Sequence, residues 1–69
     1  MVDTDRLRGL IVQNKKTQED VAKYLNIAPK TFYSKMKRKV FGSDEIEKMI
    51  DYLNIDDPVS IFFAKEVTL

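Results

Sequence analysis

The sequence contains no cysteine and no histidine among its 69 residues. Without cysteine the chain can form neither a disulfide framework nor a thiolate metal site. Without histidine it lacks a common ligand for transition metals and the commonest general base. Only two glycines occur, and no glycine-rich phosphate loop is present. We therefore expect no enzymatic activity, no cofactor, no bound metal and no small-molecule ligand.

Long apolar runs are also missing. No apolar stretch approaches the roughly 18 residues that a membrane span requires, and the N-terminus lacks the apolar run of a signal peptide. We expect a cytoplasmic protein without membrane contact. Its 69 residues make one domain, and a core this small is marginal unless the helices pack well or the chain dimerises.

Charge is divided unevenly between two parts of the chain. Residues 1–42 carry ten Lys and Arg against four Asp and Glu, a net charge of +6, whereas residues 43–69 carry two against seven, a net charge of −5. The densest run of charge is Lys37-Arg38-Lys39. The division predicts a basic pole that would attract the phosphates of a nucleic acid, with an affinity that falls steeply as salt rises.

Two short helices joined by a tight turn are predicted for residues 17–36. Thr17 can cap the first helix by accepting a hydrogen bond from the Asp20 N–H. The apolar face of this helix consists of Val21, Ala22 and Leu25. Asn26 suits a backbone turn through positive φ, so the helix should end there. Pro29 suits the first position of the second helix, because that position needs no N–H donor.

The second of these helices has one apolar side and one polar or basic side. Phe32 and Met36 are four residues apart and face inward. The outward residues are Pro29, Lys30, Thr31, Tyr33, Ser34, Lys37 and Arg38. An ordinary αα-hairpin with a solvated basic face would show the same spacing. Ala22 favours a DNA-binding pair, because a steep helix crossing needs a small residue at the contact.

One helix is predicted before this pair and another after it. The earlier one is capped by Asp3 or Thr4 and closed by Lys15-Lys16; its apolar residues are Leu7, Leu10 and Ile11. The later one starts with Ser43 as cap, and its apolar residues are Ile46, Met49, Ile50 and Leu53. Its acidic outer face, which phosphate would repel, consists of Asp44, Glu45, Glu47 and Asp51.

A last short helix is predicted from Asp57-Pro58 to about Ala64. It carries more apolar surface than one short helix can bury on a single side. We therefore predict a dimer interface made by Ile61, Phe62 and Phe63, with Phe63 as the exposed member. The alternative is a monomer in which these side chains pack inside. Residues 65–69 would be either a tail or a strand at a dimer seam.

The central part of the chain resembles the helix-turn-helix of the phage lambda-repressor/Cro-like family, the XRE-type transcriptional regulators. The likeness is carried by Thr17-Gln18-Glu19-Asp20-Val21-Ala22, by Leu25-Asn26-Ile27-Ala28 and by Thr31-Phe32, and it extends from about Leu7 to Phe63. Two positions depart from the family pattern. Asn26 replaces the usual glycine, and Ala28 replaces the Ser or Thr that usually caps the recognition helix.

The resemblance implies an all-α fold, a compact bundle of about five short helices. Residues 1–69 would form a single helix-turn-helix domain, with the motif at about 17–37 and a tail at 65–69. The protein would be a small phage-type repressor or Cro-like regulator that binds a palindromic operator in double-stranded DNA. It would bind as a homodimer through its last helix, in the cytoplasm of a bacterial host cell, at the nucleoid when bound.

The same resemblance implies roles for individual residues. The recognition helix, about 29–37, would enter the major groove. Base contacts would come from Pro29, Lys30, Thr31, Tyr33 and Ser34, and phosphate contacts from Thr17, Gln18, Lys35, Lys37 and Arg38. The alternative function is a protein-interaction module on the same fold, which would dock through the acidic helix 43–53 or the apolar C-terminal helix.

Overall fold

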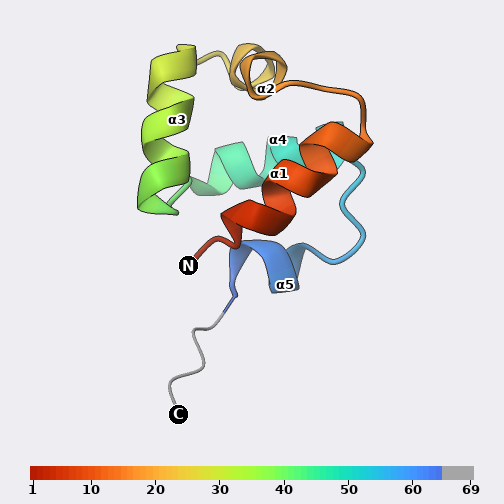
Figure 1. Cartoon of the computed structure of the whole chain (residues 1–69). Helices are drawn as coiled ribbons and strands as arrows, with labels where there is room; N and C mark the ends of the chain where they lie inside the picture. Colours follow the sequence, from red (N-terminus) through yellow and green to blue (C-terminus); the bar gives the residue numbers. More distant parts are fainter. Residues whose placement is uncertain (65–69) are drawn as a thin grey trace.

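Five helices make up the part of the chain that the computed structural model describes, residues 1–64, and no strand occurs in that range. They are α1 Thr4–Gln13, α2 Gln18–Tyr24, α3 Pro29–Arg38, α4 Ser43–Tyr52 and α5 Pro58–Phe62. In Figure 1, α2 lies at the top of the bundle, α3 runs down its left side, α1 and α4 lie in the middle, and α5 lies at the bottom. The predicted all-α bundle of five short helices is confirmed.

Three helices begin at the caps that the sequence indicates. The Asp3 side chain accepts from the N–H of the third residue of α1, and Asp57 caps α5 in the same way. At α2 the Thr17 hydroxyl accepts from the Asp20 N–H at 3.1 Å, while the Asp20 carboxylate accepts from the Thr17 N–H at 2.8 Å. This reciprocal pair satisfies two backbone groups that would otherwise lack a partner inside the helix.

The start of α4 differs from the prediction that Ser43 is its cap. Gly42 holds the N-cap position in an extended conformation, and Ser43 is the first residue of the helix. Glu45 Oε1 accepts from the Gly42 N–H at 2.8 Å. Because Phe41 is buried immediately before this turn, the chain enters α4 one residue earlier than the Ser43 signal suggested.

Each of the first four helices is followed by a non-glycine residue with positive φ: Lys15, Asn26, Lys39 and Asn54. Asn tolerates this conformation well, and the two asparagine turns match the predicted helix ends. The α1 end is different, because α1 stops at Gln13 and the Lys15-Lys16 pair lies in the turn. The last helix stops at Phe62, two residues before the predicted end.

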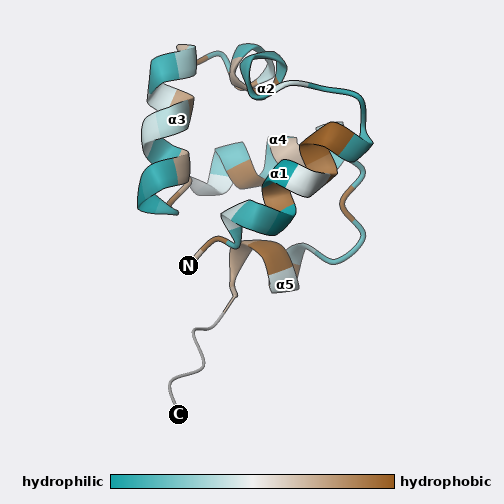
Figure 2. Cartoon of the chain, in the orientation of Figure 1, coloured by the Kyte–Doolittle hydropathy of each residue, from teal (hydrophilic) through white to brown (hydrophobic). Residues whose placement is uncertain are grey.

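The buried centre of the bundle is formed by side chains from every helix. The large side chains that are completely enclosed are Phe32, Leu7, Ile11, Met49, Leu53 and Val21. Figure 2 shows hydrophobic residues on α5 and in the middle of α1, and mostly hydrophilic residues along α3. The apolar positions at helical spacing therefore form the core, and α3 presents most of its length to solvent.

The residues before α1 connect the two ends of the bundle. Val2 is buried, and its N–H donates to the Lys39 carbonyl at the end of α3 at 3.1 Å. The Asp3 N–H donates to the Ile61 carbonyl of α5 at 2.7 Å. These two bonds join the C-terminal end of α3 and the last helix to the same short segment.

An aromatic stack fastens α2 to α4. The rings of Tyr24 and Tyr52 have centroids 4.1 Å apart at an interplanar angle of 15°. The Lys16 ammonium lies over the Tyr52 ring, 5.0 Å from its centroid. Stacked rings and a cation above them are each favourable beyond the area they bury, so the stack restrains the helix that supports α3.

The Thr17–Asp20 box predicts an acid-dependent loss of stability. The hydrogen bond from the Thr17 backbone N–H, followed by that with the Thr17 side chain, holds the pKa of Asp20 below its ordinary 3.8. A carboxyl with a lowered folded pKa stabilises the fold above 3.8, and this contribution disappears as pH falls through the folded value. Asp20→Asn should therefore reduce the free energy of unfolding at neutral pH and cost nothing in strong acid.

Urea unfolding at both pH values measures this difference. Asp56→Asn is the matched control, because Asp56 is exposed, does not cap a helix and forms no ion pair with a Lys or Arg in the described part of the chain. A deficit of the Asp20 variant that stays the same at both pH values would contradict the linkage.

Candidate nucleic-acid interface

α2 and α3 cross steeply: in Figure 1 α2 is seen almost along its axis, while α3 lies in the plane of the picture. Ala22 is completely buried, and its carbonyl accepts from the Ile27 N–H at 3.0 Å. Asn26, at φ 59°, makes the turn between them. The small residue and the left-handed turn let α3 leave α2 at a large angle, the geometry that a helix-turn-helix requires.

α3 begins at Pro29, as the sequence predicts, although it has no side-chain cap. Ala28 is extended, at φ −67° and ψ 146°, and its carbonyl accepts from the Phe32 N–H at 3.1 Å. Proline at the first position fixes φ for the helix and needs no acceptor. Although Ala28 cannot cap the helix as the usual Ser or Thr would, α3 still starts at Pro29.

Phe32 and Met36 attach α3 to the core, and they determine which side chains face outward. Both are buried, and the Phe32 ring packs against Phe41 with centroids 5.5 Å apart. At 100° per residue, Ser34 lies opposite this buried side. One flank of the helix carries Lys30, Tyr33 and Lys37, and the other carries Thr31, Lys35 and Arg38. The proposed base-contacting side chains, Pro29, Lys30, Thr31, Tyr33 and Ser34, are all exposed.

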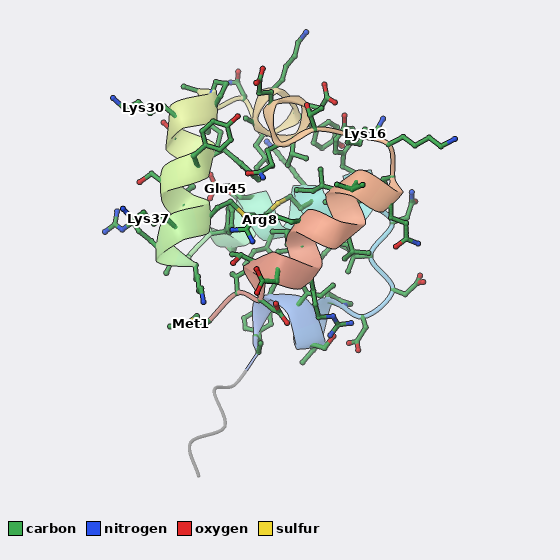
Figure 3. All side chains as sticks on the ribbon, in the orientation of Figure 1. Met1, Arg8, Lys16, Lys30, Lys37 and Glu45 are labelled. Carbon is green, nitrogen blue, oxygen red and sulfur yellow. The ribbon has the colours of Figure 1, made fainter. Side chains whose placement is uncertain are left out.

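The outward face of α3 is basic and contains no acid. Figure 3 shows Lys30 and Lys37 extending away from the body of the molecule. Among residues 1–64 only two ion pairs form, Arg8 with Asp5 at 2.7 Å and Lys35 with Glu45 at 3.0 Å. The other cations in and next to α3, which are Lys30, Lys37, Arg38 and Lys39, have no carboxylate of residues 1–64 within 4.0 Å.

Lys35 is positioned differently from the other cations of α3. Predicted as a phosphate contact, it instead directs its ammonium to Glu45, and the two side chains are 32% and 16% exposed. Glu45, predicted on the acidic outer face of its helix, lies between α3 and α4 (Figure 3). Lys35 and Glu45 meet because the short turn through buried Phe41 brings the start of α4 against the side of α3 that carries Lys35.

The start of α2 supplies the other predicted phosphate contacts. The Thr17 hydroxyl is already bonded to the Asp20 N–H, and Gln18 is half-buried. Glu19 and Asp20 lie beside them and line a shallow groove of about 590 Å³ with Pro29. Because these carboxylates would repel a polyanion, the C-terminal half of α3 is the more attractive end of the surface for phosphate.

The predicted dimer residues lie on different sides of α5. Ile61 and Phe62 are each 2% exposed, so they belong to the core of this chain and cannot reach a second subunit in this conformation. Phe63 is 63% exposed, and Val59, one turn earlier, is 65% exposed. The apolar surface that α5 offers to a partner is therefore made by Val59 and Phe63. The possible strand at 65–69 lies outside the described residues.

Residues 1–64 hold neither a cluster of metal ligands nor a membrane-spanning helix. No group of three acidic side chains gathers there as a metal site would require, and no helix of this range is long and apolar enough to cross a membrane. A groove of about 620 Å³ lies between α1 and the connection from α4 to α5, where Gly9 and Asn54 line it. None of its lining residues belongs to α3.

Two features of this surface are not among the individually predicted contact residues. Lys39 belongs to the Lys37-Arg38-Lys39 charge run, and at the end of α3 it has a left-handed backbone and an exposed side chain. The pairing of Lys35 with Glu45 crosses a turn, where no helical periodicity connects the two positions. The charge run could have indicated Lys39, whereas no local signal indicated the ion pair.

The double role of Glu45 predicts a graded response to substitution. Glu45→Ala removes the acceptor of the Gly42 N–H as well as the ion pair, and should lower the free energy of unfolding by about 0.5–2 kcal/mol. Glu45→Gln keeps an acceptor oxygen and should cost less, on the order of 0.5 kcal/mol, because a partly exposed ion pair contributes little. Urea unfolding measures both, with the exposed Glu47→Ala as control; equal losses for Ala and Gln at position 45 would rule out the hydrogen bond as the main contribution.

Comparison of the chain with protein-family models, with curated proteins and with solved structures gave no match. Inference about function therefore starts from the geometry and charge of α2 and α3 and from the motif residues between Thr17 and Phe32.

Proposed function

We propose that this chain is a sequence-specific, double-stranded DNA-binding protein of the lambda-repressor/Cro-like type, with α3 as recognition helix. The observation that carries the proposal is the exposed face of α3. Its side chains are polar or basic, four cations in and next to it lack a carboxylate partner in residues 1–64, and its opposite side is locked into the core. A rigid helix with such a face fits the major groove.

Base contacts are assigned to the residues nearest the N-terminal end of α3 and along its centre. Lys30 would donate to guanine O6 or N7, and Ser34, opposite the buried side, would bond to several bases. Pro29 would offer only apolar contact to a thymine methyl. Thr31 and Tyr33 lie on the two flanks and would extend the contact to neighbouring bases. So few polar groups would give modest sequence preference.

Phosphate contacts are assigned mainly to the other end of the helix. Lys37, Arg38 and Lys39 are exposed and would position the domain on the backbone without reading sequence. Thr17 and Gln18 would contact phosphate from the start of α2, but more weakly, because the Glu19 and Asp20 carboxylates lie beside them. The acidic C-terminal part of the chain would be directed away from the DNA.

We further propose that the protein binds a palindromic operator as a homodimer and regulates transcription, by repression when the operator overlaps a promoter in its bacterial host. Val59 and Phe63 are the exposed apolar residues that α5 would contribute to the subunit contact. In such a dimer the two copies of α3 would lie about 34 Å apart, one turn of DNA. Binding, with no catalytic step and no cofactor, would be sufficient for this role.

Substitutions in α3 should separate base reading from backbone attraction. Lys30→Ala should weaken preference at one base pair by about 1–3 kcal/mol, because a base contact is lost. Lys37→Ala should weaken binding to all sequences alike and flatten the dependence of affinity on salt by about one unit of slope. Fluorescence anisotropy with duplexes obtained by selection from random sequence measures both effects, with Lys48→Ala on α4 as the charge-matched control.

Equal effects of Lys30→Ala and Lys37→Ala on every duplex would contradict the assignment of roles. Absence of any duplex binding at low salt would remove the DNA-binding proposal. It would favour a protein-interaction module that docks through the acidic helix or α5.

The dimer proposal predicts a specific loss from a change on α5. Phe63→Asp should weaken self-association and should lower affinity for a palindromic duplex far more than affinity for a single half-site. The introduced charge is exposed in one chain but would be desolvated in the pair. Sedimentation equilibrium and half-site titration measure these effects, and Glu47→Asp serves as control. A monomeric wild-type protein that binds one half-site as tightly as the palindrome would refute the dimer.

A further inference from the structure

We infer that Glu45 limits the affinity of the proposed DNA interface by holding Lys35 away from the phosphate backbone. The inference rests on the proposed function and names a residue of α4 that adjusts how many cations of α3 reach the DNA. Glu45 is the one acid of residues 1–64 that forms an ion pair with α3. Without that pair, Lys35 would be free to join the basic surface.

The position of Lys35 on its helix supports this interpretation. Thr31, Lys35 and Arg38 follow one another at helical spacing along one flank of α3, so a Lys35 released from Glu45 would lie beside the exposed Arg38 guanidinium. In the structure its Nζ is instead 3.0 Å from Glu45 Oε1, directed toward the start of α4. Figure 3 shows the contrast between Glu45, which lies beside α3 in the interior of the view, and the Lys30 and Lys37 side chains, which extend outward.

Glu45 is fixed strongly enough to retain Lys35. The same Oε1 atom accepts from the Gly42 N–H at 2.8 Å, and the side chain is only 16% exposed. If the ammonium of Lys35 turned to a phosphate, this enclosed carboxylate would lose its counter-charge and would face the approaching polyanion. The pair is partly exposed and contributes little by itself, so the exchange is opposed mainly by repulsion between the unpaired Glu45 carboxylate and the DNA phosphates.

Glu45→Gln tests this arrangement without removing the turn. The amide oxygen of glutamine can still accept from the Gly42 N–H, whereas its neutral side chain no longer holds the Lys35 ammonium. One additional cation then contacts phosphate. Affinity for a duplex at low salt should rise about five- to tenfold, and the slope of log affinity against log salt should become steeper by about 0.9, the value for one added phosphate contact.

Three matched variants isolate the contribution of Lys35. Glu47→Gln makes the same charge change at an exposed position of α4 that has no contact with Lys35, and it should raise affinity much less. Lys35→Met should leave the affinity of the otherwise unchanged protein within about twofold, because the Lys35 ammonium is already paired with Glu45. In the Glu45→Gln background, Lys35→Met should abolish the gain, as expected for two coupled residues.

Fluorescence anisotropy with one duplex across a range of salt concentrations measures the unchanged protein, these four variants and Lys37→Met. Loss of folding cannot imitate the expected result, because unfolding lowers affinity and Glu45→Gln should raise it. The inference fails if Glu45→Gln and Glu47→Gln have equal affinities and slopes, or if Lys35→Met weakens the otherwise unchanged protein as much as Lys37→Met does. In both cases the wild-type protein still binds DNA, so the proposed function would survive; absence of wild-type binding would overturn both.

Discussion

The burial of Phe32 and Met36 is the constraint on which the rest of the structure depends. These two side chains attach one side of α3 to the core, and helical geometry then places Ser34 on the opposite side, in solvent. The Ala22 contact and the Asn26 turn orient the helix, but neither would hold it without that anchor. Such an anchor would favour the proposed binding, because the backbone of a firmly packed helix loses little freedom when it binds.

The charge on the exposed side of α3 varies along the helix. Cations are concentrated at the C-terminal end of α3, whereas Glu19 and Asp20 stand near its start and Glu45 occupies Lys35 on one flank. Phosphate would thus be attracted most strongly at Lys37 and its neighbours. In the proposed interface these carboxylates would reduce the attraction of phosphate. Non-specific binding depends almost entirely on phosphate contacts. Weaker phosphate contacts would therefore raise the affinity for the correct sequence relative to other sequences.

Much of the helix-turn-helix pair could be predicted from the sequence, because its signals act within a single turn. Thr17 caps α2 and Asn26 ends it, and each depends only on neighbours in the chain. Contacts between distant segments could not be predicted in this way. The Lys35 and Glu45 pair crosses a turn, and the Ile61 carbonyl accepts a hydrogen bond from the Asp3 N–H, far away in the sequence. Neither contact leaves a periodic pattern in the sequence.

The central claim is that the outward side of α3 is the surface that meets DNA. The most direct measurement is a titration of the isotopically labelled protein with duplex DNA, followed by the NMR shifts of each backbone amide. If α3 is the DNA-binding surface, the shifts will concentrate at residues 29–39 and at the start of α2 and will diminish as salt is added. Shifts concentrated on α4 or α5, with those of α3 unchanged, would contradict it.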